Sequence, residues 1–268
     1  MRPKFWQFQT PSTDIMIEII ELYYQVMILM GLIVGLVFGL ICYMSYKFYY
    51  KRNPIPSKFN SSIKLEILWT VIPTIIICMI AVPSIQLIKK INTTPEAEFT
   101  IKVTGHQWFW SYKYINHQNI EFDSRMLGDE DNWDLNITNS SFSKILEEND
   151  LDPQINSNEA TFFKEMPTNT KVRLLEVDNR MVIPVNKIVR LIFTSGDVIH
   201  SFTIPSAGLK MDCIPGKITE TWLKINKIGV YRGQCSELCG ANHGFMPIVV
   251  EVVSGEDFLL WINNKMIE

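Results

Sequence analysis

Residues 233–253, GQCSELCGANHGFMPIVVEVV, join a loop of metal-binding side chains to a β-branched run that is typical of a strand. Cys235, Cys239, His243 and Met246 follow one another in this loop at short, regular gaps. Glu237 stands between the cysteines, where its carboxylate or its carbonyl oxygen is placed to face a metal. Thiolate, imidazole and thioether together favour copper, because soft ligands select softer metal states, whereas structural zinc sites use cysteine and histidine. The loop therefore predicts a copper site beside a strand.

A copper site of this kind needs a second imidazole from outside the loop. His106 lies in a tryptophan-rich stretch and His117 in a polar one, whereas His200 lies in the β-like segment DVIHSFTIP. His200 is the best candidate, although such a histidine on its own is more often a core residue. Two thiolates are able to bridge two copper ions. A single blue-copper site is one alternative, and a disulfide between the two loop cysteines is the other.

The segment after residue 93 is predicted to be an all-β sandwich or barrel, because short β-branched or alternating runs are separated there by glycine, proline or asparagine. The runs are Phe99–Val103, Lys171–Val177, Ile188–Thr194, Ile199–Ile204, Glu220–Ile225 and Ile248–Val253. Only the tail, Gly255–Met266, has its apolar residues at helical spacing.

Two uncharged apolar stretches precede this domain, within residues 24–46 and 67–88. Each is long enough to cross a bilayer, which takes about 20 residues, and neither has the polar face that a long helix of a soluble protein usually shows. The link between them is rich in lysine and arginine, which places it in the cytoplasm or matrix by the positive-inside rule. We therefore predict a transmembrane hairpin within residues 1–92 and an external domain over residues 93–268. The net charge of −3 leaves no basic footprint for nucleic-acid binding.

Residues 125–170 interrupt the strand pattern. They are rich in Asp, Glu, Asn and Ser, yet they carry too many apolar residues, Trp133 and Phe142 among them, for a fully solvated linker. We interpret this segment as an acidic insertion that packs against a neighbour.

Together these motifs closely resemble subunit 2 of cytochrome c oxidase, the haem–copper terminal oxidase of respiration. The matching blocks occur in the family's order and cover nearly the whole chain apart from the insertion. They are LEILWTVIPTIII, GHQWFWSY, FDS, LLEVDNR, DVIHSFTIPSAGLKMDCIPG and the stretch quoted first. The resemblance implies a helical hairpin followed by a cupredoxin-like β-barrel that carries the binuclear copper centre called CuA. It also implies that electrons from reduced cytochrome c pass to haem in subunit 1, where oxygen is reduced to water with proton pumping.

The resemblance further implies roles for individual residues. Cys235 and Cys239 are the bridging ligands of two coppers, His200 and His243 bind one copper each, and Met246 and the Glu237 carbonyl are the remaining ligands. The Glu237 carboxylate is implied to reach a magnesium ion shared with subunit 1. Trp108 resembles the residue through which electrons arrive, and Glu66 resembles a carboxylate at a proton-channel entrance. Aromatic packing at a membrane interface and a simple charge at a helix end are the respective alternatives.

Departures from the family remove one possible hydroxyl group, at Phe109, and change residues that dock a basic cytochrome c. Phe109 stands where relatives often carry tyrosine, and Lys113, Gln118 and Asn119 occupy a stretch that is often acidic in relatives. Acidic side chains that remain are Asp123, Asp178 and Asp197. We expect the insertion to steer the partner through Asp129, Glu130, Asp131 and Asp134.

Three other functions are weaker interpretations of the same residues. A copper chaperone or thiol reductase combines CxxxC with a distant histidine, but on a single span and a thioredoxin-like domain. Quinol-oxidase relatives keep the fold without the metal ligands, and a purely structural subunit leaves the ligand set unexplained. An Ile- and Asn-rich chain without a presequence fits an organelle-encoded protein. We therefore expect the mitochondrial inner membrane, with the C-terminal domain in the intermembrane space; a bacterial plasma membrane is the alternative.

Overall fold

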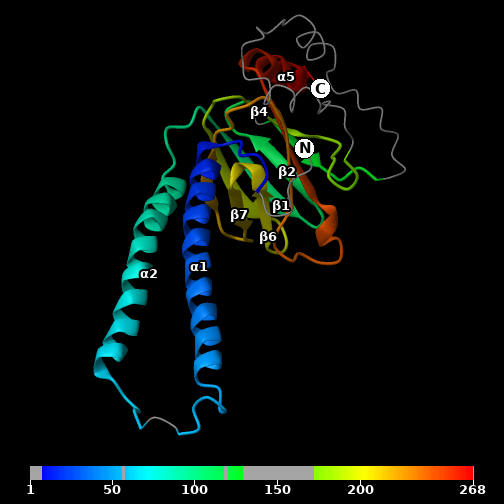
Figure 1. Cartoon of the computed structure of the whole chain (residues 1–268). Coiled ribbons are helices and arrows are strands. Elements are labelled where there is room, and N and C mark those ends of the chain that lie inside the picture. The colour runs from blue at the N-terminus through cyan, green and yellow to red at the C-terminus, as the bar shows by residue number, and fades with distance from the viewer. Residues whose placement is uncertain (1–7, 56–57, 118–119, 129–171, 268) are drawn as a thin grey trace, which may run out of the picture. The chain divides into compact units, whose positions relative to one another are not determined.

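The computed structural model describes residues 8–55, 58–117, 120–128 and 172–267. The chain divides into two compact units, one formed by Ile17–Asn92 and the other by the rest of the chain. Figure 1 follows the order of the elements, from two long helices into a β-domain and a final helix.

The first unit is built from two long helices, α1 (Asp14–Lys47) and α2 (Ile63–Asn92). They contain the two predicted spans, and both are long and apolar enough to cross a membrane. Their large apolar side chains are mostly exposed, as expected of a surface that meets lipid or another subunit. An ion pair between Glu18 and Lys90 joins the two helices. Pro73 and Pro83 lie inside α2, where a membrane helix tolerates them.

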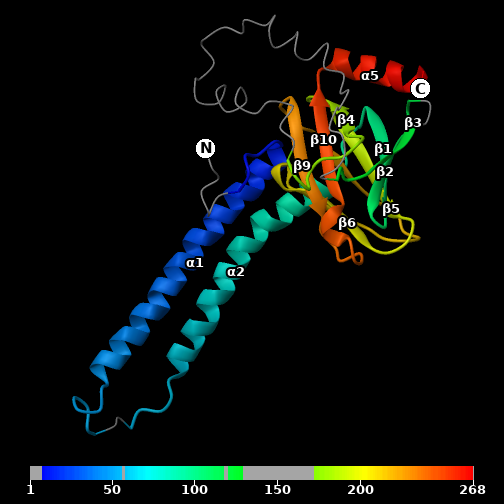
Figure 2. The same cartoon turned by 90° about the vertical axis from the view of Figure 1, so that its right-hand side faces the viewer.

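The second unit contains two five-stranded sheets, which Figure 2 shows with most strands labelled. The first sheet has the order β3 (Ile120–Ser124), β2 (Phe109–Tyr114), β1 (Phe99–His106), β5 (Val189–Ser195) and β8 (Thr219–Leu223). The second has the order β4 (Met181–Pro184), β10 (Pro247–Val253), β9 (Gly229–Cys235), β6 (His200–Ile204) and β7 (Leu209–Cys213). Most neighbours run antiparallel, but β1 with β5 and β10 with β4 are parallel.

Both sheets contribute to one hydrophobic core. Every second residue of β1 and β5 is buried, so one face of the first sheet points inward. Trp110 and Phe193 from the first sheet meet Phe202 from the second. The Tyr114 hydroxyl crosses between the sheets, since it donates to Val182 O at 2.8 Å and accepts from Val182 N at 2.9 Å. A two-sheet β-domain after two apolar helices confirms the predicted fold class.

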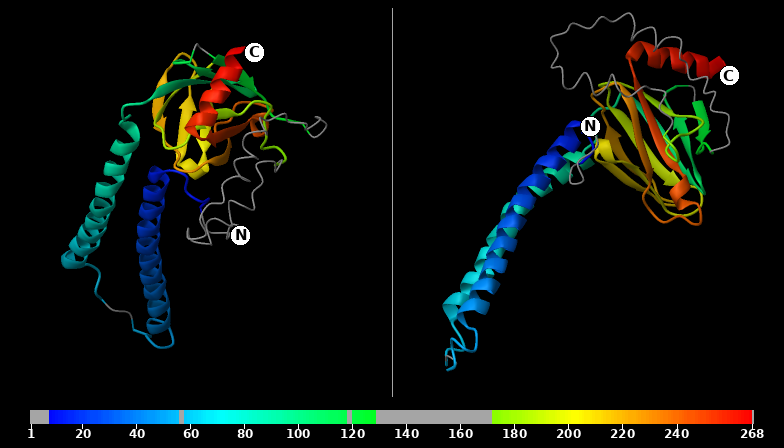
Figure 3. Two further views of the ribbon diagram at one scale, coloured as in Figure 1. Left: turned by 90° about the horizontal axis from the view of Figure 1, so that it is seen from above. Right: turned by 45° about the vertical axis from the view of Figure 1, so that its right-hand side comes forward.

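Helix α5 (Gly255–Ile267) covers one end of the β-domain (Figure 3). Ser254 caps it, because its hydroxyl accepts a hydrogen bond from Asp257 N at 3.1 Å. Phe258 is buried and stacks on Phe99, with ring centroids 5.2 Å apart. His117 meets both of these rings edge-on. The predicted tail helix is therefore present and docked on the core.

A buried ion cluster fixes the segment that precedes β4. Glu176, whose side chain is 1% exposed, accepts hydrogen bonds from Arg180 Nε at 2.9 Å and from Arg232 Nη2 at 2.8 Å. Arg180 also reaches Glu251 on β10 at 3.4 Å. Two carboxylates and two guanidinium groups thus offset one another's charge away from bulk water.

Five of the six predicted strand runs coincide with observed strands, with ends shifted by a few residues. The run Lys171–Val177 was wrong in its described part: Leu174 has φ +65° and Leu175 N donates to Val172 O at 2.9 Å, which makes a turn. Strands β2, β3, β4, β7 and β9 were missed, since they are short, aromatic or glycine-containing. The insertion, apart from residues 125–128, lies outside the described residues, as do Gln118 and Asn119. The β-domain excludes the thioredoxin-like alternative.

Candidate metal centre

Strand pairing brings His200 to the first cysteine of the loop. His200 begins β6 and Cys235 ends β9, and the antiparallel register of these strands sets Phe202 opposite Cys235. Cys235 Sγ therefore lies 3.9 Å from His200 Nδ1. Gly105 on β1 leaves room for the imidazole, because a Cβ there would be 2.8 Å from His200 Cδ2.

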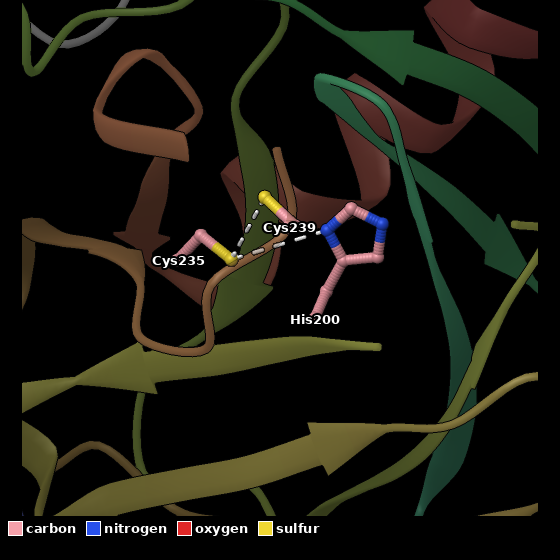
Figure 4. A group of neighbouring side chains, drawn as sticks. All are labelled: His200, Cys235 and Cys239. Carbon is pink, nitrogen blue, oxygen red and sulfur yellow. Dashed lines mark hydrogen bonds between the residues drawn. The ribbon is translucent and has the colours of Figure 1, made fainter. Parts of the chain in front are cut away.

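The loop between β9 and β10 folds back so that its other donors meet the same point. Cys235 N donates to Met246 O at 3.3 Å, which closes the loop, and a short 3-10 helix covers His243–Phe245. The two cysteine sulfurs are 3.9 Å apart. Cys239 Sγ lies 3.4 Å from His243 Nδ1 and 3.4 Å from Met246 Sδ. Figure 4 shows both thiols and the His200 imidazole directed toward one another.

Glu237 presents its two oxygen-bearing groups differently. Its carbonyl oxygen lies 3.4 Å from Cys235 Sγ, while the residue as a whole is exposed. The backbone therefore faces the cluster, and the carboxylate is available to groups outside it.

The donor set fits copper. The ligand atoms of His200, Cys235 and Cys239 all lie within 4.8 Å of one another, and all three residues are buried. The cysteines are free thiols, so the disulfide alternative does not describe this structure. The half-exposed His243 and the buried Met246 add an imidazole and a thioether beside Cys239. Thiolate and thioether are soft ligands and imidazole suits copper, so this donor set favours copper over hard cations.

The charges of the cluster also call for a cation. Burial raises the pKa of the Cys235 thiol, but hydrogen bonds with His200 and with backbone groups of Ser201 and Glu237 lower it more, to about 7. Burial and the neighbouring Cys235 raise the pKa of Cys239 to about 12. One thiolate therefore forms readily, whereas a second repels the first unless positive charge binds between them.

Asp197 orients the His200 ring. A hydrogen bond joins His200 Nε2 and Asp197 Oδ1 at 2.8 Å, which leaves Nδ1 directed at the thiols. Burial lowers the pKa of His200, but the contacts with Cys235 and Asp197 outweigh it and raise the pKa. Trp110 supports the same ligands, since its ring meets His200 edge-on and its Nε1 donates to Met246 O at 3.4 Å.

Trp108 and Glu66, the other two predicted site residues, are not among the clustered donors. Trp108 is half-buried in the turn between β1 and β2, beside the metal loop. Glu66 is exposed in the first turn of α2, in the other unit. Sequence reasoning missed the contact of Asp197 with His200, although the spacing in DVIH was available, and it missed Gln107 altogether. For Gln107 no local pattern pointed to the site.

A membrane-anchored β-domain that gathers thiols, imidazoles and a thioether in one buried loop is a copper-binding electron-transfer protein. Family comparison gives the same answer in finer terms. The transmembrane domain of cytochrome C oxidase subunit II matches residues 3–87, and its periplasmic domain matches residues 99–150 and 147–253. The chain belongs to the cytochrome c oxidase subunit II family. It is a subunit of a terminal oxidase that takes electrons from cytochrome c through a CuA-type copper site.

Relatives come from bacteria and from plants. A protein of Rickettsia felis described as a probable cytochrome c oxidase subunit 2 is 45% identical over 265 residues, which cover 98% of this chain and 73% of the relative. Cytochrome c oxidase subunit 2 of Oenothera berteroana is 38% identical over 270 residues, which cover 98% of this chain and 91% of the relative. The crystal structure of the periplasmic domain of subunit II from Bradyrhizobium japonicum is 38% identical with a TM-score of 0.48, and it covers 65% of this chain and 97% of that chain.

Proposed function

We propose that this chain holds the two-copper centre with Cys235 and Cys239 as bridging thiolates and His200 and His243 as one imidazole for each copper. Met246 and the Glu237 carbonyl complete the ligand set. The observation that carries this proposal is the meeting of all these donors around two sulfurs 3.9 Å apart. Each further donor lies 3.4–3.9 Å from one of these sulfurs.

Residues around the copper ligands explain why the geometry of the site should change little between redox states. When bound, a copper pair would supply one-electron chemistry and would accept one electron from each reduced cytochrome c. Asp197 and Trp110 hold the ligands from outside, and the cysteines and Met246 are almost fully buried, which excludes water. Ligands held in place by a β-domain do not need to reorganise at each transfer.

Three further roles are carried by exposed or half-buried groups. The half-buried Trp108 ring beside the metal loop suits it to receive electrons from cytochrome c. The exposed Glu237 carboxylate suits a magnesium ion shared with subunit 1, because Mg²⁺ is usually held by one or two carboxylates and oxygen ligands from elsewhere. Glu66 is an exposed carboxylate in the first turn of α2, and this position at a helix end supports a role at the entrance of a proton channel. With subunit 1, the complex passes the electrons to haem and pumps protons.

The mitochondrial inner membrane, with the β-domain in the intermembrane space, is our proposed location. Cytochrome c oxidase subunits 2 from plants and algae are among the relatives, as are bacterial ones, and an Ile- and Asn-rich composition supports an organelle-encoded protein. The acidic insertion is proposed to steer cytochrome c. Deleting residues 127–168 should weaken the salt dependence of cytochrome c oxidation; an unchanged salt dependence refutes that role.

The ligand assignment is tested in the purified complex by Cys235→Ser. We expect loss of the near-infrared mixed-valence absorption and of the CuA signal in electron paramagnetic resonance. Cys213→Ala is the matched control, since Cys213 is also a buried free thiol but lies outside the ligand cluster. Normal near-infrared absorption in Cys235→Ser refutes the assignment.

A further inference from the structure

The turn between β1 and β2 is bonded to the metal centre at two places through one residue, Gln107. Its side-chain Nε2 donates to Cys239 O at 2.8 Å. Its backbone N donates to Asp197 Oδ2 at 2.7 Å, and the other oxygen of Asp197 holds His200. Gln107 therefore reaches a thiolate ligand of the loop and, through Asp197, an imidazole ligand of β6.

The residue that follows Gln107 packs on the same loop. Gly240, directly after Cys239, has φ +125°, a region that side-chain-bearing residues rarely adopt. A Cβ at Gly240 would lie 3.0 Å from Gln107 Nε2 and 3.2 Å from both Nε1 and Cζ2 of Trp108. The indole ring thus lies against loop backbone one residue away from a metal ligand, in space that a side chain at Gly240 would occupy.

We infer that Gln107 is a positioning residue that holds the Trp108 ring on the metal loop. The ring packs against Gly240, which leaves room for it because glycine has no side chain. This inference rests on the proposed function, in which Trp108 receives the electron from reduced cytochrome c. Tunnelling between two groups weakens steeply with the gap between them, so a ring held in contact with the loop transfers faster than one free to move. Gln107 is suited to this task, because it directly precedes Trp108 in the chain and its side-chain amide donates a hydrogen bond to the Cys239 carbonyl oxygen.

A purely structural role for Gln107 predicts that its replacement destabilises the β-domain, whereas a positioning role predicts slower electron transfer in an intact fold. Gln107 is exposed as a residue and makes no part of the hydrophobic core. Its replacement should therefore leave the fold intact and act on electron transfer. A change that acts through Trp108 should also vanish when the indole is absent.

The test uses the whole oxidase complex carrying Gln107→Leu, Gly240→Ala, Trp108→Leu or the double variant Gln107→Leu/Trp108→Leu. Asn263→Ala, an exposed change on α5, is the control. Three quantities are measured for each: the rate of CuA reduction by reduced cytochrome c, the rate of the following transfer to haem, and the rate at which a chelator removes copper.

Gln107→Leu and Gly240→Ala should each slow CuA reduction about tenfold, and Gln107→Leu should speed copper removal by a similar factor, as changes around metal ligands typically do. The transfer to haem should match the control.

The outcomes separate the two proposals. If Trp108→Leu reduces CuA as fast as the control, the proposed electron route is wrong. If Trp108→Leu is slow while Gln107→Leu and Gly240→Ala match the control, the route stands and the positioning role of Gln107 is refuted. A double variant slower than Trp108→Leu alone also refutes it, because Gln107 then acts independently of the ring. A double variant equal to Trp108→Leu supports it.

Discussion

Gly233 lies in β9 against the backbone of the neighbouring antiparallel strand β6, and replacing it by alanine should break the pairing of these two strands. A Cβ at Gly233 would be 1.7 Å from Thr203 O and 2.8 Å from Thr203 C, both backbone atoms of β6. Real Cβ contacts essentially never fall under 3.0 Å, so β6 and β9 must separate by more than an ångström. The ladder that would part is short, since it consists of Phe202 opposite Cys235 and Thr203 opposite Gln234.

The cost follows from the hydrogen bonds lost. Two buried backbone bonds contribute about 1 kcal/mol each, and leaving one partner unsatisfied adds about 1–3 kcal/mol, so we expect about 3–5 kcal/mol of destabilisation. Because about 1.4 kcal/mol corresponds to tenfold, the population of the opened β-domain should rise by at least about 100-fold. Copper should also be held less well, since this ladder sets Cys235 beside His200.

Proteolysis of the subunit in the purified complex measures the opened population, and the copper-to-haem ratio measures the centre. Gly255→Ala is the control, because a Cβ at Gly255 meets nothing within 4 Å. If Gly233→Ala had the same proteolysis rate and copper content as wild type, the close contact of β6 and β9 at this glycine would not be what builds the site.

Three further predictions follow from other contacts. Glu176→Gln should destabilise the β-domain by about 3–5 kcal/mol, because the positive charges of Arg180 and Arg232 lose their buried partner; an unfolding midpoint equal to that of wild type would contradict this. Met246→Leu should shift the midpoint potential of the copper centre in a redox titration while copper content stays near wild type, since thioethers are weak ligands; loss of copper with an unchanged potential is the opposing result. Burial lowers the pKa of His117 from 6.5, so the folded state disfavours its protonation, and stability should fall as pH drops below that value. His117→Gln should remove this loss when thermal midpoints at pH about 5 and about 8 are compared; an equal pH dependence in both proteins would exclude His117 as its cause.

The membrane hairpin, the tail helix and half of the strands of the β-domain were predictable because their signals are local. Uncharged length alone indicates the two spans, and helical spacing of Phe258 and Ile262 indicates α5. Strands such as β9 escaped prediction, since a glycine and polar residues occupy positions that only the neighbouring strands make suitable. The run ending at Val177 has the composition of a strand, but the left-handed Leu174 turns the chain and sends Glu176 into the buried ion cluster.

At the metal loop, some features follow from the sequence and others depend on the tertiary structure. The loop donors and the kind of metal are readable from the sequence, because Cys235, Cys239, His243 and Met246 lie within one short segment whose chemistry is explicit. The folded chain was needed to bring His200 next to Cys235, to turn the Glu237 carbonyl toward the thiols, and to let Gln107 reach Cys239. The physical reason is register: contacts between residues far apart in the chain depend on which residues of two strands stand opposite each other, and a slip of one position turns each side chain to the other face.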